Sequence, residues 1–153
     1  NITSGTDKDA LSNIERLKFN DKHIALDLDG HAGETVKLLS LLLGKTQATN
    51  TTYVGAGLKL LDDGMTYEQL MSAALDVVLG ANASSISVVE LIWNNLIGPP
   101  TPADNISQYS ALIDNGTYTS AGLAIVAADH SLNTTAIDLV GLTQTGVEYL
   151  LYG

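Results

Sequence analysis

The sequence predicts a mainly α protein, with about seven helices in two pseudo-repeated halves that form one bundle and a short N-terminal β hairpin. Three observations carry this prediction. Apolar residues follow a helical period from about residue 34 almost to the end. Apolar and polar residues alternate over 17–28. Helix–glycine-turn signatures recur at an offset of about 52 to 54 residues.

The N-terminal segment, 1–33, is expected to hold the hairpin and the seam that follows it. Residues 1–9 are polar and predict no regular structure. Leu17 and Phe19, and then Ile24, Leu26 and Leu28, alternate with polar residues. This period of two indicates strands within 10–19 and 22–28 around a polar turn.

The helical domain is expected over 34–153. Its first helix begins near Glu34 and is apolar nearly all round, which predicts a buried helix that ends at Gly44. A capping box from Thr66 to Gln69 opens the third helix, and Pro102 suits the first position of the fifth. A further capping box, from Ser87 to Glu90, opens the fourth helix, with an earlier start near Ser84 as the alternative. The other helices after the first are expected at about 52–63, 66–79, 101–115, 119–129 and 133–149, and the fourth is expected to end before Gly98.

The two related halves cover about 34–80 and 85–130, and a closing helix follows them. Leu60–Thr66 parallels Leu112–Tyr118, and Val36–Gly44 parallels Val89–Gly98. Each unit therefore contains helix, glycine turn, helix, Asp-x-Gly turn and helix. The pattern predicts a positive φ at the equivalent glycines, Gly64 and Gly116.

Composition bounds the function. Acidic residues number 17 and basic residues 7, for a net charge of −10. This balance argues against nucleic-acid partners and anionic membranes, and it suits metal cations or simply solubility. The absence of cysteine excludes disulfides and thiol chemistry. No apolar run approaches the roughly 18 residues of a membrane span, so no membrane insertion is expected.

Calcium is the candidate cofactor. Asp27, Asp29 and Glu34 surround the Asp-x-Asp-Gly turn before the first helix, and carboxylates on a short turn are typical Ca²⁺ ligands. The spacing is not that of an EF-hand, because Glu34 is only the eighth residue counted from Asp27. The alternative is that Asp29 or Glu34 stabilises the helix N-terminus.

No residue pattern indicates an enzyme. His23, His31 and His130 lack the spacing of a zinc site, and Asp129-His130-Ser131 cannot form a hydrolase triad because adjacent side chains do not converge. Trp93 shares an apolar helical stripe with Val89 and Leu96, which predicts a buried, structural indole.

The chain resembles a bacterial family in three places. Residues 11–21, 24–30 and 32–33 look like the lead-in of large secreted RTX-type proteins. The repeated helical units and the ending 136–149 resemble the domain of unknown function 4214. The resemblance covers about 11–149, although the usual Gly-Arg-x-Pro-Asp turn is absent after Gly44 and RTX nonapeptides are missing.

The resemblance implies an extracellular or cell-surface location, type I secretion and no known reaction. We therefore expect a non-enzymatic accessory module of a larger parent chain, which aids extracellular folding or assembly and is a candidate for calcium binding. The alternative is an adhesive or carbohydrate-binding module for surface polysaccharide or neighbouring surface proteins. An enzyme with an unrecognised site is a third hypothesis.

Overall fold

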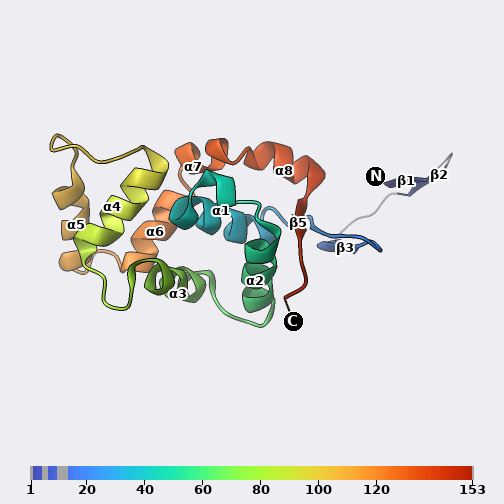
Figure 1. Cartoon of the computed structure of the whole chain (residues 1–153), viewed down its shortest axis with the longest axis horizontal. Coiled ribbons are helices and arrows are strands. Elements are labelled where there is room, and N and C mark those ends of the chain that lie inside the picture. Colours follow the sequence, from blue (N-terminus) through green and yellow to red (C-terminus); the bar gives the residue numbers. More distant parts are fainter. Residues whose placement is uncertain (1, 5–6, 10–13, 153) are drawn as a thin grey trace.

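The computed structural model describes residues 2–4, 7–9 and 14–152 and confirms a mainly helical bundle (Figure 1). Two short antiparallel sheets accompany it, β1–β2 and β3–β4–β5. The helices are α1 (His31–Leu43), α2 (Thr51–Asp62), α3 (Tyr67–Leu79), α4 (Ser85–Leu96), α5 (Ile106–Asp114), α6 (Ser120–Ala128), α7 (Ser131–Ala136) and α8 (Leu139–Thr145), with a 3₁₀ turn, η1 (Lys45–Gln47). The strands are β1 (Ile2–Ser4), β2 (Asp7–Asp9), β3 (Arg16–Lys18), β4 (His23–Ala25) and β5 (Val147–Tyr149).

Helix α1 forms the centre of the bundle, as its apolar sequence predicted. It packs against α2, α3, α4, α6 and α7. Leu41 and Val36 are completely enclosed, and the same apolar core extends to Ala25 before α1 and to Val147 at the end of the chain. One continuous core therefore crosses the expected seam at 33/34.

The two halves use the same order of helices and glycine turns. Gly64 follows α2 with a φ of 101°, and Gly116 follows α5 with a φ of 77°. Both glycines lie at the position where a left-handed residue ends a helix, which confirms the prediction made from the repeat. The capping box between Thr66 and Gln69 is also confirmed, because both of its reciprocal hydrogen bonds are formed.

The C-terminal segment differs from its prediction. A single helix over about 133–149 was expected, but α7 ends at Ala136, and Asp138 adopts a left-handed conformation before α8. Gly146, with a φ of 75°, then turns the chain into β5. The prediction was wrong because local periodicity does not reveal the antiparallel pairing of Val147 with Ala25 across the sheet.

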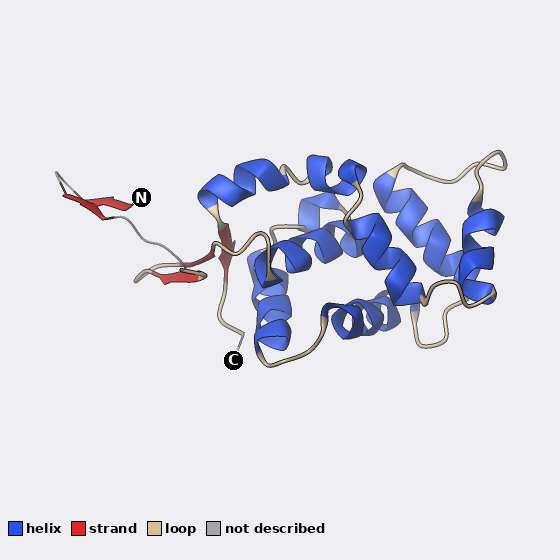
Figure 2. Cartoon of the chain, turned by 180° about the vertical axis from the view of Figure 1, so that it is seen from behind, coloured by secondary structure: helices blue, strands red, loops and turns tan. Residues whose placement is uncertain are grey.

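The predicted hairpin is confirmed, and β5 adds a third strand to it. Strand β4 pairs with β3 on one side and with β5 on the other, so segments from the two ends of the chain meet in one sheet. Figure 2 shows this sheet at one end of the bundle. Residues 10–13 of the expected first strand lie outside the described residues. Strands β1 and β2 form a separate hairpin within 1–9, where no regular structure was expected.

Close backbone approaches join the sheet end to the bundle. A β-carbon on Gly55 would lie 1.8 Å from the carbonyl oxygen of Leu150, and one on Gly57 would lie 2.6 Å from the Thr35 methyl group. Leu150 also donates its N–H to the Thr51 carbonyl at 3.0 Å. Glycine on α2 therefore permits both the α1–α2 contact and the docking of the chain after β5.

The fifth helix begins later than predicted. It was expected to open at Thr101 and Pro102, but α5 starts at Ile106. The N–H and hydroxyl of Thr101 both donate to the Asp104 carboxylate, at 2.6 and 3.0 Å. This local turn uses the groups that would otherwise begin a helix. Within the described residues, no helix combines the length and the hydropathy that crossing a bilayer requires.

Candidate functional site

Asp27, the first residue of the expected calcium site, is engaged by protein groups. One carboxylate oxygen is paired with the Arg16 guanidinium, and the other accepts the Ala32 N–H at 3.3 Å. The Asp27 carbonyl accepts the N–H groups of Gly30 and Gly33. Asp27 thus closes the turn before α1 and caps its first residues. A cation bound to Asp27 would have to compete with Arg16.

Asp29 and Glu34 lie near Asp27 in sequence but have different surroundings. Asp29 is exposed at the turn, whereas Glu34 is half-buried in the first turn of α1. Within residues 2–4, 7–9 and 14–152, no three His, Asp or Glu side chains form a group able to hold a metal ion. Calcium binding by Asp27, Asp29 and Glu34 stays a prediction.

Arg16 connects the sheet to the helices. Besides Asp27, its guanidinium contacts both carboxylate oxygens of Asp62 at 3.0 and 3.3 Å. His31 Nδ1 lies 2.7 Å from the same Asp62 carboxylate, which makes Nδ1 the donor in that bond. This network joins β3, the start of α1 and the end of α2. It accounts for Arg16, Asp27 and Asp62 as residues that make structural contacts.

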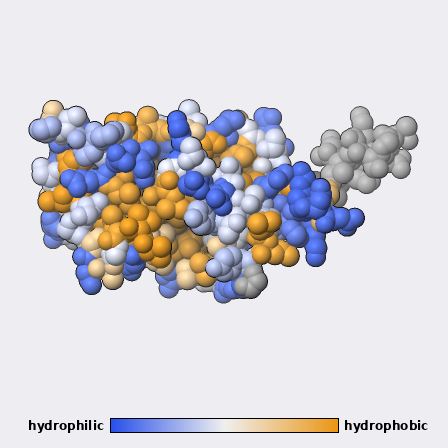
Figure 3. Space-filling view, in the orientation of Figure 1, coloured by the Kyte–Doolittle hydropathy of each residue, from blue (hydrophilic) through white to orange (hydrophobic). Residues whose placement is uncertain are grey.

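An apolar cavity lies elsewhere, between α4, α5, α6 and the start of α7. We call it the α4 groove. Its volume is about 330 Å³, and its lining is overwhelmingly apolar. Figure 3 shows apolar surface gathered over α6 and the neighbouring helices in this half of the molecule. The groove is lined by Val89, Ile92, Trp93, Leu96, Ile97, Tyr109, Leu123, Val126, Ala127, His130 and Leu132.

Trp93 forms part of the groove wall, which corrects the prediction of a buried core indole. It is half-buried, and its ring lies 5.9 Å from that of Tyr109 at a tilt of 47°. Ile97, Val126 and Leu132 around it are each at least half exposed. The prediction placed Trp93 on the correct apolar stripe, but this side of α4 borders an open cavity.

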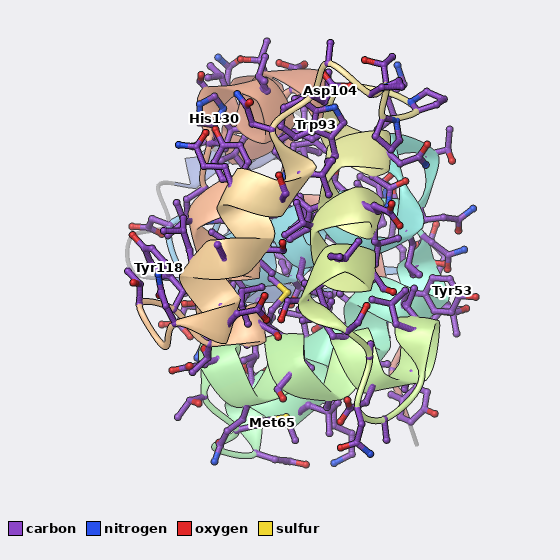
Figure 4. All side chains as sticks on the ribbon, turned by 90° about the vertical axis from the view of Figure 1, so that its left-hand side faces the viewer. Tyr53, Met65, Trp93, Asp104, Tyr118 and His130 are labelled. Atoms are coloured by element: carbon purple, nitrogen blue, oxygen red, sulfur yellow. The ribbon has the colours of Figure 1, made fainter. Side chains whose placement is uncertain are left out.

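His130 is a polar side chain in the groove, and its hydrogen bonding fixes its tautomer. Its Nδ1 accepts the Leu132 N–H at 3.2 Å and thereby caps α7. The neutral ring therefore carries its proton on Nε2. In Figure 4 the labels of Trp93 and His130 both lie at the top of the end that contains α4 and α5.

The part of the chain that forms the groove is acidic. Residues 60–153 contain ten acidic residues and no Lys or Arg, whereas residues 1–59 contain seven of each sign. The whole net charge of −10 therefore comes from the part that includes α4 to α8. Glu90 and Asp104 line a second hollow, between α4 and the segment that leads into α5. The groove combines apolar walls with acidic surroundings.

Sequence reasoning missed the groove for a physical reason. The apolar residues of α4 follow the same helical stripe whether a neighbouring helix covers them or not. The sequence signal that could have pointed to this region is its charge, because α4, α5, α6 and α7 contain no Lys or Arg. The comparisons add no relative: no family model, curated protein or solved structure matches this chain.

Proposed function

We propose that this chain is a non-enzymatic accessory module of a larger secreted or surface-attached bacterial protein, and that it works by holding an apolar partner surface in the α4 groove. The location, the bacterial origin and the larger parent follow from the resemblance described above. The binding role is supported by the groove itself, which exposes aromatic and aliphatic side chains in one cavity between helices.

The observation that carries the binding role is the position of Trp93 in an open apolar cavity of about 330 Å³. Ligand pockets generally have volumes of roughly 300–1,000 Å³ and mostly apolar linings with few polar groups. The α4 groove satisfies both conditions, and exposing such a surface without a partner is unfavourable in water.

The groove lies away from the sheet. The sheet β3–β4–β5 is on the right-hand side of Figure 1, whereas α4 and α5 lie on the left.

A carbohydrate-binding role is the second candidate, and the neighbouring rings of Trp93 and Tyr109 favour it. Sugars, however, also require several hydrogen-bonding groups around the aromatic platform. His130 is the main polar side chain of the groove, so the lining fits an apolar surface better than a polyhydroxylated one.

The test uses N-phenyl-1-naphthylamine, a neutral apolar fluorophore. Trp93 is the only tryptophan of the chain, so energy transfer from it reports probe bound nearby. We expect saturable binding of about one probe per chain. Val126→Arg in the groove should weaken binding at least about tenfold. Val77→Arg, at an 86% exposed valine of α3, is the matched control and should leave binding unchanged.

The proposal is wrong if the probe does not saturate, or if Val77→Arg reduces binding as much as Val126→Arg. Soluble oligosaccharides form a separate arm of the same titration. A saturable change in Trp93 emission on adding an oligosaccharide, which persists when the fluorophore is added, would favour the carbohydrate-binding alternative.

Calcium binding, proposed at Asp27, Asp29 and Glu34, has its own test. Binding to the folded state alone would add about 2.7 kcal/mol to the free energy of unfolding at a hundredfold excess over Kd. Because Arg16 occupies Asp27, Arg16→Gln should increase the rise in melting temperature that Ca²⁺ produces. Asp27→Ala combined with Asp29→Ala should abolish that rise. An unchanged melting temperature in both the wild type and Arg16→Gln excludes the site.

A further inference from the structure

We propose that the occupant of the α4 groove is a basic amphipathic helix of a partner protein, with Lys or Arg beside its apolar face. This inference rests on the proposed binding function and names the chemistry of the partner. Three features carry it: the length of the groove, its apolar lining and the charge around it.

The groove has the dimensions of a helix-binding site. Along α4 its wall extends from Val89 to Ile97, which is about 12 Å at 1.5 Å per residue. Apolar side chains at positions i, i+3 or i+4, and i+7 of a helix span about 10 Å. A bound helix could therefore place two or three consecutive anchors along this wall, with Trp93 near its middle.

The lining selects apolar anchors. Trp93, Tyr109, Leu123 and Val126 present rings and methyl groups from three different helices. Helix-in-groove complexes derive most of their affinity from such anchors, because burial removes apolar surface from water on both partners. Large aromatic residues in the centre of an interface are also typical binding hot spots.

The charge around the groove selects the polar side of the partner. Glu90 lies one turn before Trp93 on α4, and Asp129 immediately precedes His130. No Lys or Arg lies on the helices that form the groove. Asp129 is partly neutralised by Lys37 of α1, at 2.5 Å, whereas Glu90 is exposed. A basic partner would gain from the remaining acidic field, in its encounter rate above all.

The same field disfavours other occupants. A second copy would bring another acidic surface with the same net charge of −10. Anionic lipids and nucleic acids would be repelled for the same reason. Charge complementarity therefore points to a cationic polypeptide as the partner.

The experiment compares three synthetic 14-residue peptides. The first places Leu on one helical face and Lys elsewhere. The second replaces each Lys with Glu. The third keeps the Leu and Lys composition but scrambles their order, which removes the apolar face. Binding is measured by the blue shift of Trp93 emission, and peptide helicity by circular dichroism. We expect the Leu/Lys peptide to bind and become helical, and the other two to bind at least about tenfold more weakly.

Matched variants locate the contact on the chain. Val126→Arg should weaken binding of the Leu/Lys peptide more than about tenfold, whereas Val77→Arg should not. Glu90→Gln should weaken binding of the Leu/Lys peptide several-fold. Asp76→Asn, at an exposed position of α3, removes the same charge away from the groove and should leave binding unchanged. Binding should also fall as salt is raised, because screening weakens the attraction between opposite charges.

Each contrary outcome has a defined meaning. Equal binding of the Leu/Lys and Leu/Glu peptides, or of the scrambled peptide, overturns the basic-helix inference while the groove still binds. If the neutral fluorophore binds but none of the three peptides does, the basic-helix inference is also overturned, and the groove is limited to small apolar ligands. A shift of Trp93 emission with phosphatidylcholine or phosphatidylglycerol vesicles instead of peptides would assign the surface to membranes. Failure of the fluorophore itself would reject the proposed function.

Discussion

Helices α1 and α4 open the two related halves, yet one is enclosed and the other forms a groove. Nine of the 13 residues of α1 are buried, but only three of the 12 residues of α4. Both sequences are apolar and end at a glycine turn. The difference therefore comes from what packs around each helix rather than from the helix itself. The repeat supplies a core helix in one half and an accessible surface in the other.

Polar side chains support the enclosure of α1. Asn95 of α4 donates to the carbonyls of Leu41 and Leu42 at 2.8 and 3.1 Å. Asn133 of α7 donates to the carbonyls of Lys37 and Ala128 at 3.0 and 2.9 Å. Helices α4 and α7 thus hold α1 by hydrogen bonds as well as by packing.

The largest expected effect compares Leu41→Ala with Trp93→Ala. Leu41 is enclosed on all sides, so its truncation leaves a cavity and should cost about 3–5 kcal/mol. Trp93 borders an open groove, so its truncation should cost less than about 2 kcal/mol while removing probe binding. Urea unfolding monitored by circular dichroism measures both costs, and the emission of the directly excited fluorophore measures its binding to Trp93→Ala, which lacks the energy donor. If Trp93→Ala lowers the free energy of unfolding as much as Leu41→Ala does, the indole is part of the core and not of an accessible groove.

The second prediction concerns the polar contacts of α1. Asn133 is only 2% exposed, and Asn133→Ala would remove the hydrogen bonds that its side chain donates to the Lys37 and Ala128 carbonyls. We expect a cost of about 2–3 kcal/mol, because buried groups that lose a hydrogen bond keep their desolvation penalty. Asn94→Ala, at an exposed position of α4, is the control and should change stability little. Equal effects of the two variants would contradict the role of Asn133.

Much of the fold could be predicted because local chemistry determines it. The capping box at Thr66, the positive φ at Gly64 and Gly116, and the buried α1 all follow from residues within a few positions of one another. The pairing of Val147 with Ala25 could not be predicted in this way, because it joins residues far apart in sequence. The position of Trp93 beside an open groove was missed for the same reason, since it depends on how distant helices pack around α4.

The third prediction sharpens the repeat itself. Gly64→Ala and Gly116→Ala should each cost about 1–2 kcal/mol, because a β-carbon is unfavourable at positive φ. A β-carbon added at either glycine would meet none of the described atoms within 4 Å, so the cost should come from the backbone alone and be similar in both halves. Thermal unfolding compares the two variants. Markedly different costs would show that the two turns are not equivalent.

The smallest expected effect concerns the hydroxyl group of Tyr67, a residue that packs beside α1. Tyr67 opens α3, and its ring centre lies 6.0 Å from Lys37 Nζ of α1. Among the described residues, its enclosed hydroxyl has no hydrogen-bond partner. Tyr67→Phe should therefore be neutral or stabilising at pH 7, by up to about 1 kcal/mol. Tyr53→Phe, at a more exposed ring on α2, is the matched control.

The same substitution has a consequence at alkaline pH. Burial, followed by the nearby charges of Asp129 and Glu34, raises the pKa of Tyr67 in the folded protein. The unfolded chain then loses this proton first, at a pKa of about 10. Stability linked to Tyr67 is complete below about pH 10 and declines as the pH rises above it. Urea unfolding at about pH 8, 10 and 11 should show a smaller alkaline loss for Tyr67→Phe than for the wild type or Tyr53→Phe. Parallel losses in all three proteins would mean that the Tyr67 hydroxyl ionises in the folded state as readily as in the unfolded chain.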